Sequence, residues 1–69
     1  MKKKDVHAKI KRIMQEMEME ENKNQYMFPV LEREGKEYLK YLSNNQTDGL
    51  LLHRFYKLKD KISMEIFGF

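Results

Sequence analysis

The sequence predicts an all-α protein, a small bundle of three helices. Two apolar stripes indicate this fold, because both repeat with a 4-3-4 spacing that places their members on one side of a helix. They consist of Val6, Ile10, Ile13 and Met17 and of Leu51, Phe55, Leu58 and Ile62. Polar connectors and helix-start residues divide the chain, so the expected helices span residues 4–22, 29–44 and 48–67.

The expected first helix, residues 4–22, contains neither glycine nor proline, and charged residues fill most positions outside its stripe. Its charges oppose the helix dipole, since lysines crowd its start and glutamates crowd its end. Each misplaced charge costs about 0.3–1 kcal/mol at low salt. This arrangement suits an antiparallel neighbour whose opposite charges lie alongside, and it equally suits a polyanion at the N-terminal half.

The middle segment, residues 29–44, is ambiguous because it also fits a β-hairpin that turns at Glu34 and Gly35. A helix would cost roughly 1 kcal/mol at Gly35 relative to alanine. Residues 37–42, however, do not alternate as a strand requires. A helix also gathers the apolar side chains on one half of its circumference: Val30, Leu31, Tyr38, Leu39, Tyr41 and Leu42. We therefore expect a helix, and an α-β-hairpin-α chain is the alternative.

Local signals mark where the later helices begin and end. Pro29 suits the first turn of a helix, where its missing N–H is not needed. Thr47 and Asp48 supply an N-cap and an acidic residue for the first turn of the third helix. Gly68 follows the last apolar residues of that helix and fits the position directly after a helix end.

Length and composition restrict the class of protein. A chain of 69 residues makes one domain, residues 1–69, and buries only ~60% of the surface of its unfolded form. The absence of cysteine excludes disulfides and thiolate metal sites and fits a cytoplasmic location. No apolar run is long enough for a membrane span, and the lysine-rich start lacks the apolar segment of a signal peptide.

The charge balance is mildly basic, with 14 basic and 11 acidic residues and a net charge of +3. Six of the basic residues form an N-terminal basic set that is the best candidate site for a nucleic acid or an acidic partner: Lys2, Lys3, Lys4, Lys9, Lys11 and Arg12. Contacts from this set to phosphates would be sequence-independent and salt-dependent. The alternative is a solvated surface, because Asp5 and the glutamates that follow weaken its field.

A second group of basic residues surrounds Tyr56 and consists of Arg54, Lys57, Lys59 and Lys61. An aromatic ring among cations would allow a nucleic-acid base to stack. These residues are spread around the expected third helix instead of lining one face. We therefore expect them to be solvated surface.

Catalysis finds no support in the residues. His7 and His53 have no partner at the spacing of a metal site or a catalytic triad. The chain has no glycine-rich phosphate loop, no nucleophile motif and no pair of carboxylates in an apolar setting. We therefore expect no enzyme, no cofactor, no metal and no small-molecule substrate.

The leading functional interpretation is a small regulatory or adaptor protein that binds another protein, of the kind that phages, plasmids and bacteria encode. The narrow stripe of the first helix also suits a second copy of the chain, which would make a homodimer. The candidate interface residues are Val6, Ile10, Ile13, Met17, Met19 and Phe69. The alternative function is a small nucleic-acid-binding module that uses the basic N-terminal helix.

Overall fold

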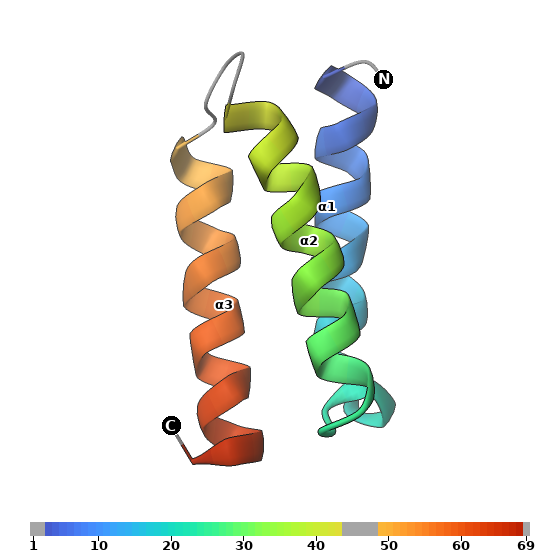
Figure 1. The fold of residues 1–69 in the computed structure, drawn as a ribbon, viewed down its shortest axis with the longest axis vertical. Coiled ribbons are helices and arrows are strands. Elements are labelled where there is room, and N and C mark those ends of the chain that lie inside the picture. Colours follow the sequence, from blue (N-terminus) through green and yellow to red (C-terminus); the bar gives the residue numbers. More distant parts are fainter. Residues whose placement is uncertain (1–2, 44–48, 69) are drawn as a thin grey trace.

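The computed structural model of the protein describes residues 3–43 and 49–68. They form α1 (Lys3–Met17), a short 3₁₀ turn η1 (Glu20–Asn22), α2 (Met27–Ser43) and α3 (Gly49–Phe67). The three long helices lie side by side, and α2 runs opposite to α1 and α3 (Figure 1). The described residues contain no strand, so the predicted three-helix bundle is confirmed and the hairpin alternative for the middle segment is wrong.

The core is apolar and draws on all three helices. It contains the whole first stripe and three members of the second, and Leu58, the fourth member, packs half-buried against it. None of the polar or charged side chains in the described residues is buried. The buried side chains are Val6, Ile10, Ile13, Met17, Phe28, Leu31, Leu39, Leu42, Leu51, Phe55 and Ile62.

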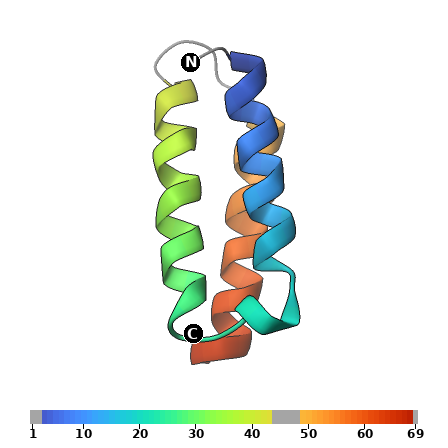
Figure 2. The same cartoon turned by 90° about the vertical axis from the view of Figure 1, so that its right-hand side faces the viewer.

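Helix α1 ends at Met17, five residues before the predicted end at residue 22. Beyond it the hydrogen bonds tighten, since the N–H of Met19 donates to the carbonyl of Glu16 at 3.2 Å, only three residues back. The side-chain amide of Asn22 also donates to the carbonyl of Glu16, at 2.9 Å. The glutamates crowded here oppose the negative end of the helix dipole, which disfavours further α-helical turns. Turn η1 therefore follows, at the end of the bundle where α3 also ends (Figure 2).

Helix α2 begins at Met27, two residues before the predicted start. The side-chain oxygen of Asn24 accepts hydrogen bonds from the N–H groups of Tyr26 and Met27, at 2.9 and 2.8 Å. Its carbonyl accepts from the N–H of Phe28 at 3.1 Å, so Asn24 caps the helix. Pro29, the predicted start, lies within the first turn of the helix.

Gly35 lies at the centre of the bundle, where the three helices meet at one level. A Cβ atom added to Gly35 would lie 2.6 Å from Cζ of Phe55 on α3 and 3.5 Å from Cγ2 of Ile13 on α1. Real Cβ atoms do not approach other atoms within 3.0 Å, so only glycine leaves room for the Phe55 ring. The helix penalty that the sequence analysis assigned to Gly35 is thus offset by close packing.

Helix α3 is tied to the rest of the bundle by ion pairs at its edges. The ammonium of Lys59 lies 3.5 Å from a carboxylate oxygen of Glu32 on α2 and 3.1 Å from one of Asp60. The hydrogen bond to Asp60 raises the pKa of Lys59, against the opposing effect of partial burial, and the charges of Asp60 and Glu32 raise it further. A second ion pair joins the residue after η1 to α3, since the ammonium of Lys23 lies 3.8 Å from a carboxylate oxygen of Glu65.

Of the two predicted end signals of α3, only the one at its C-terminal end lies within the described residues. Thr47 and Asp48, the predicted N-cap and first-turn acid, lie outside the described residues. At the other end the helix finishes at Phe67, and Gly68 has a positive φ of 81°. The N–H of Gly68 donates to the carbonyl of Met64 at 2.9 Å, which confirms the predicted role of this glycine after the helix end.

Candidate interaction groove

The structure corrects the interface that the sequence analysis assigned to the first stripe. The stripe residues are at most 4% exposed, because α2 and α3 already cover them: Val6, Ile10, Ile13 and Met17. They form the core of one copy and are not available as a seam for a second. Of the two other candidates, Met19 is 46% exposed just beyond α1, and Phe69 lies outside the described residues.

The N-terminal basic set does not lie on one face. Lys4, Lys9, Lys11 and Arg12 are all exposed on α1, whereas Lys2 and the side chain of Lys3 lie outside what the structure describes. Lys9 and Arg12 line a hollow shared with α2. Lys11 lines a different hollow shared with α3. The structure therefore divides the N-terminal basic set between two sides of the bundle.

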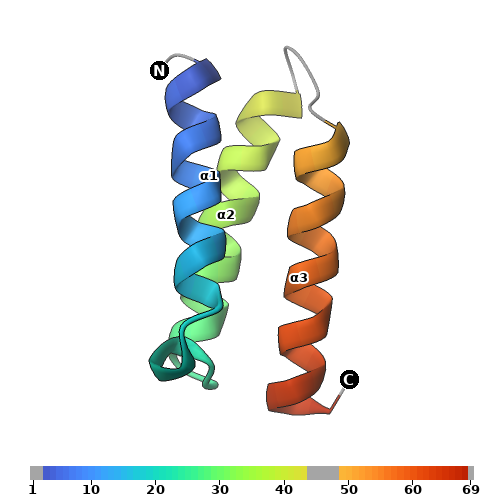
Figure 3. The ribbon, with the colours of Figure 1, turned by 180° about the vertical axis from the view of Figure 1, so that it is seen from behind.

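The hollow between α1 and α3, of about 450 Å³, is the larger of these two and is named the basic groove. Both helices run in the same direction along it (Figure 3). Its lining combines three cationic side chains, three apolar ones, one amide and one carboxylate: Lys11, Arg54, Lys57, Met14, Leu51, Leu58, Gln15 and Glu18.

The apolar residues form the floor of the basic groove and the cations form its rim. Leu51 is buried and Met14 and Leu58 are half-buried, while Lys11, Arg54 and Lys57 are exposed. Glu18 gives one end of the groove a negative charge. This arrangement can bind an elongated ligand that has an apolar side and negative charges flanking it.

Only one of the three cations of the basic groove, Lys11, belongs to the N-terminal basic set that the sequence predicts as a site. For Arg54 and Lys57 the sequence predicts solvated surface, because the basic residues near Tyr56 spread around the third helix. A usable signal was present, since Met14 and Arg54 lie directly beside members of the two apolar stripes. Residues that flank a buried stripe form the edges where two helices meet.

The charges of the three helices separate into two halves of the bundle. The level of Ile13, Gly35 and Phe55 divides the bundle into two halves. Counting described side chains from Lys4 onward, the half that contains the start of α1 has seven basic residues and two acidic ones. These are Lys4, Lys9, Lys11, Arg12, Lys36, Lys40 and Arg54, with Asp5 and Glu37. The other half has five basic residues and eight acidic ones: Lys23, Arg33, Lys57, Lys59 and Lys61, with Glu16, Glu18, Glu20, Glu21, Glu32, Glu34, Asp60 and Glu65.

This separation differs from the expected pairing of α1 with a complementary antiparallel neighbour. Helix α2 is antiparallel to α1, but its later part carries Lys36 and Lys40 and lies beside the lysines of α1. Its first part carries Glu32 and Glu34 and lies beside the glutamates of α1. The bundle thus has a basic half and an acidic half. The described residues from Lys4 onward give the first a net charge of +5 (seven basic, two acidic) and the second a net charge of −3 (five basic, eight acidic).

The described part of the chain contains neither a candidate metal site nor a candidate membrane span. Across residues 3–43 and 49–68, histidines, aspartates and glutamates nowhere gather in threes as a metal ion would need. None of the helices there combines the length and the apolar character of a membrane span. Comparisons with protein-family models, with curated proteins and with solved structures find no match for this chain.

Proposed function

We propose that this protein is a small adaptor or regulator that binds an acidic, amphipathic segment of another protein in the basic groove. The supporting observation is the apolar strip of Met14, Leu51 and Leu58, which runs between cations of α1 and α3. Amphipathic helices commonly bind by laying their apolar side into such a groove. Glutamates and aspartates on the flanks of the segment would then meet Lys11, Arg54 and Lys57.

The two parts of the groove would contribute differently to binding. The apolar floor supplies affinity, at about 25 cal/mol per Å² of apolar surface removed from water. Methionine suits this role because its flexible, polarisable side chain adapts to different partners. The exposed cations each contribute only about 0.2–1 kcal/mol, and their main effects are faster association and the choice of an acidic partner.

Charge reversal at the groove cations tests this proposal. We expect a designed helical peptide, with leucines on one face and glutamates on its flanks, to bind the wild-type protein. Replacing Arg54 and Lys57 together with glutamate turns two attractions into repulsions and should weaken binding about tenfold or more. Fluorescence anisotropy of the labelled peptide measures this change.

The matched control replaces Lys9 and Arg12 with glutamate, which changes the net charge equally but lies outside the groove. We expect this control variant to retain most of the affinity for the peptide. Equal losses in both variants would show that only net charge matters and would contradict a groove site. Absence of wild-type binding up to about 1 mM peptide would also contradict the proposal.

A second candidate function is nucleic-acid binding at the basic half. The observation that favours it is the gathering of seven basic against two acidic residues there, drawn from all three helices. The N-termini of α1 and α3 and the C-terminus of α2 lie in the same half, so the helix dipoles add a net positive partial charge there. Lysines and arginines of this kind would contact phosphates without reading sequence.

The second prediction tests this candidate with a labelled DNA duplex of random sequence. If several phosphates are neutralised, affinity should fall ~10³-fold or more between about 50 and about 200 mM salt. Replacing the N-terminal basic set with glutamine should then lower the affinity and flatten the salt dependence. Fluorescence anisotropy at the two salt concentrations measures both effects, and no binding at the lower one would reject nucleic acid as a partner.

A further inference from the structure

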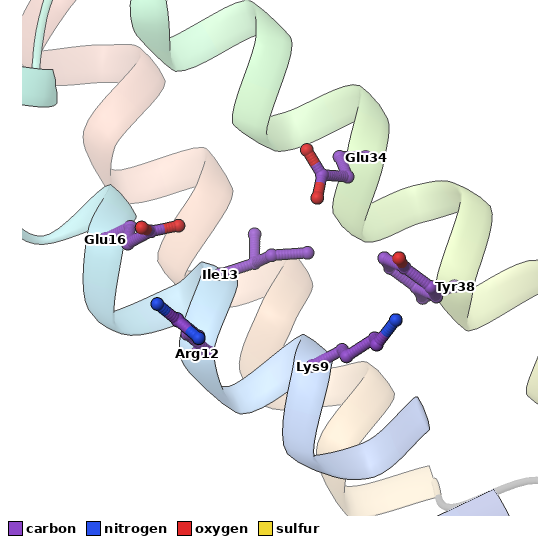
Figure 4. A pocket seen from close by; sticks show the side chains of 6 residues that line it. All are labelled: Lys9, Arg12, Ile13, Glu16, Glu34 and Tyr38. Carbon is purple, nitrogen blue, oxygen red and sulfur yellow. The ribbon is translucent and has the colours of Figure 1, made fainter. Parts of the chain in front are cut away.

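A second hollow, of about 300 Å³, lies between α1 and α2 on a different side of α1 from the basic groove. Figure 4 shows its lining, with Ile13 at the centre. Lys9 and Arg12 lie on the side of the basic half, and Glu16 and Glu34 lie on the side of the acidic half. The charge of this surface therefore reverses midway along the bundle.

These four charged side chains form no ion pair with one another or with other residues in the described part of one copy. Within the described residues, Arg12, Glu16 and Glu34 make no ion pair, although both signs line one hollow. The ammonium of Lys9 lies 5.6 Å from the centre of the Tyr38 ring, and it too forms no ion pair there. Both carboxylates and both cations thus remain available to a partner.

Exposed apolar side chains flank the hollow on both sides. Met27, Val30 and Tyr41 are 44%, 43% and 45% exposed. Steps of three or four residues connect them through Glu34 and Tyr38, so all lie along one side of α2. Val30 lies five residues before Gly35 and Tyr41 lies six residues after it, which places them at similar distances from the central level of Ile13 and Gly35.

We propose that a second copy of this chain binds here, and that the two copies form an antiparallel dimer with a twofold axis near Ile13. A twofold interface is self-complementary, since each half of the patch meets the opposite half on the partner. Lys9 and Arg12 of one copy would meet Glu16 and Glu34 of the other, and Tyr41 would meet Val30 and Met27. The basic half of one copy would also lie beside the acidic half of the other.

A second copy fits this face better than an unrelated acidic or basic protein. A partner of one charge sign would be attracted to one side of Ile13 and repelled from the other, because the sign reverses there. The dimer would leave the basic groove open, since that groove uses other residues of α1, such as Lys11 and Met14. Each dimer would then present two grooves, so a partner with two acidic segments would gain affinity from both.

Analytical ultracentrifugation of the full chain tests the dimer directly. With rising protein concentration, from about 1 to about 300 µM at low salt, the measured mass should rise from 8.5 kDa toward twice that value. Replacing Lys9 and Arg12 with glutamate should weaken self-association about tenfold or more, because like charges then face each other. The variant with Glu16 and Glu34 replaced by lysine should behave in the same way.

Mixing these two charge-reversed variants is the decisive experiment. Each variant alone should be mainly monomeric at concentrations where the wild-type chain dimerises. In a mixture every reversed charge faces an opposite charge, so a mixed dimer should form. Regained dimerisation also shows that both variants are folded. The control variant with Arg54 and Lys57 replaced by glutamate should still dimerise while losing the acidic peptide, so the dimer and the groove proposal fail separately.

Two results would overturn the dimer. One is a wild-type mass that stays at 8.5 kDa across the whole concentration range at low salt. The other is self-association that persists in both charge-reversed variants and gains nothing from mixing them, since a dimer would then use a different face.

Discussion

Replacing Phe55 with alanine is expected to lower the free energy of unfolding by about 3–5 kcal/mol. The ring of Phe55 is fully buried, and it lies at the level where α3 meets Gly35 of α2 and Ile13 of α1. Removing it leaves a cavity that the neighbouring helices cannot fill, because Gly35 has no side chain to offer. For a domain this small the loss would be most of the total stability.

Chemical denaturation followed by circular dichroism measures the effect of the Phe55 substitution. Leu50→Ala is a suitable control, because it truncates an apolar residue of the same helix that is 63% exposed. We expect this control to change stability by less than about 0.5 kcal/mol. Similar losses in the two variants would mean that α3 does not pack through Phe55.

Gly35→Ala is the substitution with the next largest expected effect, and its sign runs against helix propensity. Alanine in a helix interior is favoured over glycine by about 1 kcal/mol. The new methyl group would overlap the Phe55 ring, which is fully buried, so the ring or the helices around it must shift. Overpacking of this kind costs about 1–3 kcal/mol. After the gain in helix propensity is subtracted, we expect a net loss of up to about 2 kcal/mol in the free energy of unfolding.

Gly49→Ala provides the matched control, since a Cβ atom at the start of α3 meets nothing within 4 Å. It should raise stability by about 0.5 kcal/mol, because alanine restricts the unfolded chain. Combining Gly35→Ala with Phe55→Leu tests the contact itself. A smaller side chain at position 55 makes room for the methyl group. The double variant should therefore lose less free energy of unfolding than the two single variants lose together. Full additivity would place the origin of the Gly35 effect elsewhere.

Much of the fold could be predicted from local pattern. The stripe of α1 and the stripe of α3 both identified residues that are buried, because helical spacing alone decides which side chains share a face. The ends of the helices were less predictable. α1 stops at Met17 because the carbonyl of Glu16 accepts bonds that end the helix, and α2 starts early because Asn24 caps it. Both ends depend on a few local hydrogen bonds that periodicity does not reveal.

The candidate sites were predictable only in part. Lys9, Lys11 and Arg12 were singled out as one basic patch, but the fold sends Lys11 to one side of α1 and the other two to another side. Their partners in each hollow come from distant parts of the chain, such as Arg54 and Glu34. Which residues meet across helices depends on the rotation and register of packing, which the sequence of one helix does not specify.

By itself the sequence determined the helical class of this protein and most of its core, because spacing along a single helix is a local property. Only the tertiary structure decided which side chains remain exposed and which charges lie side by side on the surface. It covered the α1 stripe, so Val6 and Ile10 hold the bundle together and do not form an outer seam. It also placed the basic parts of α1 and α2 together, because charges distant in sequence become neighbours only when helix directions and register are set.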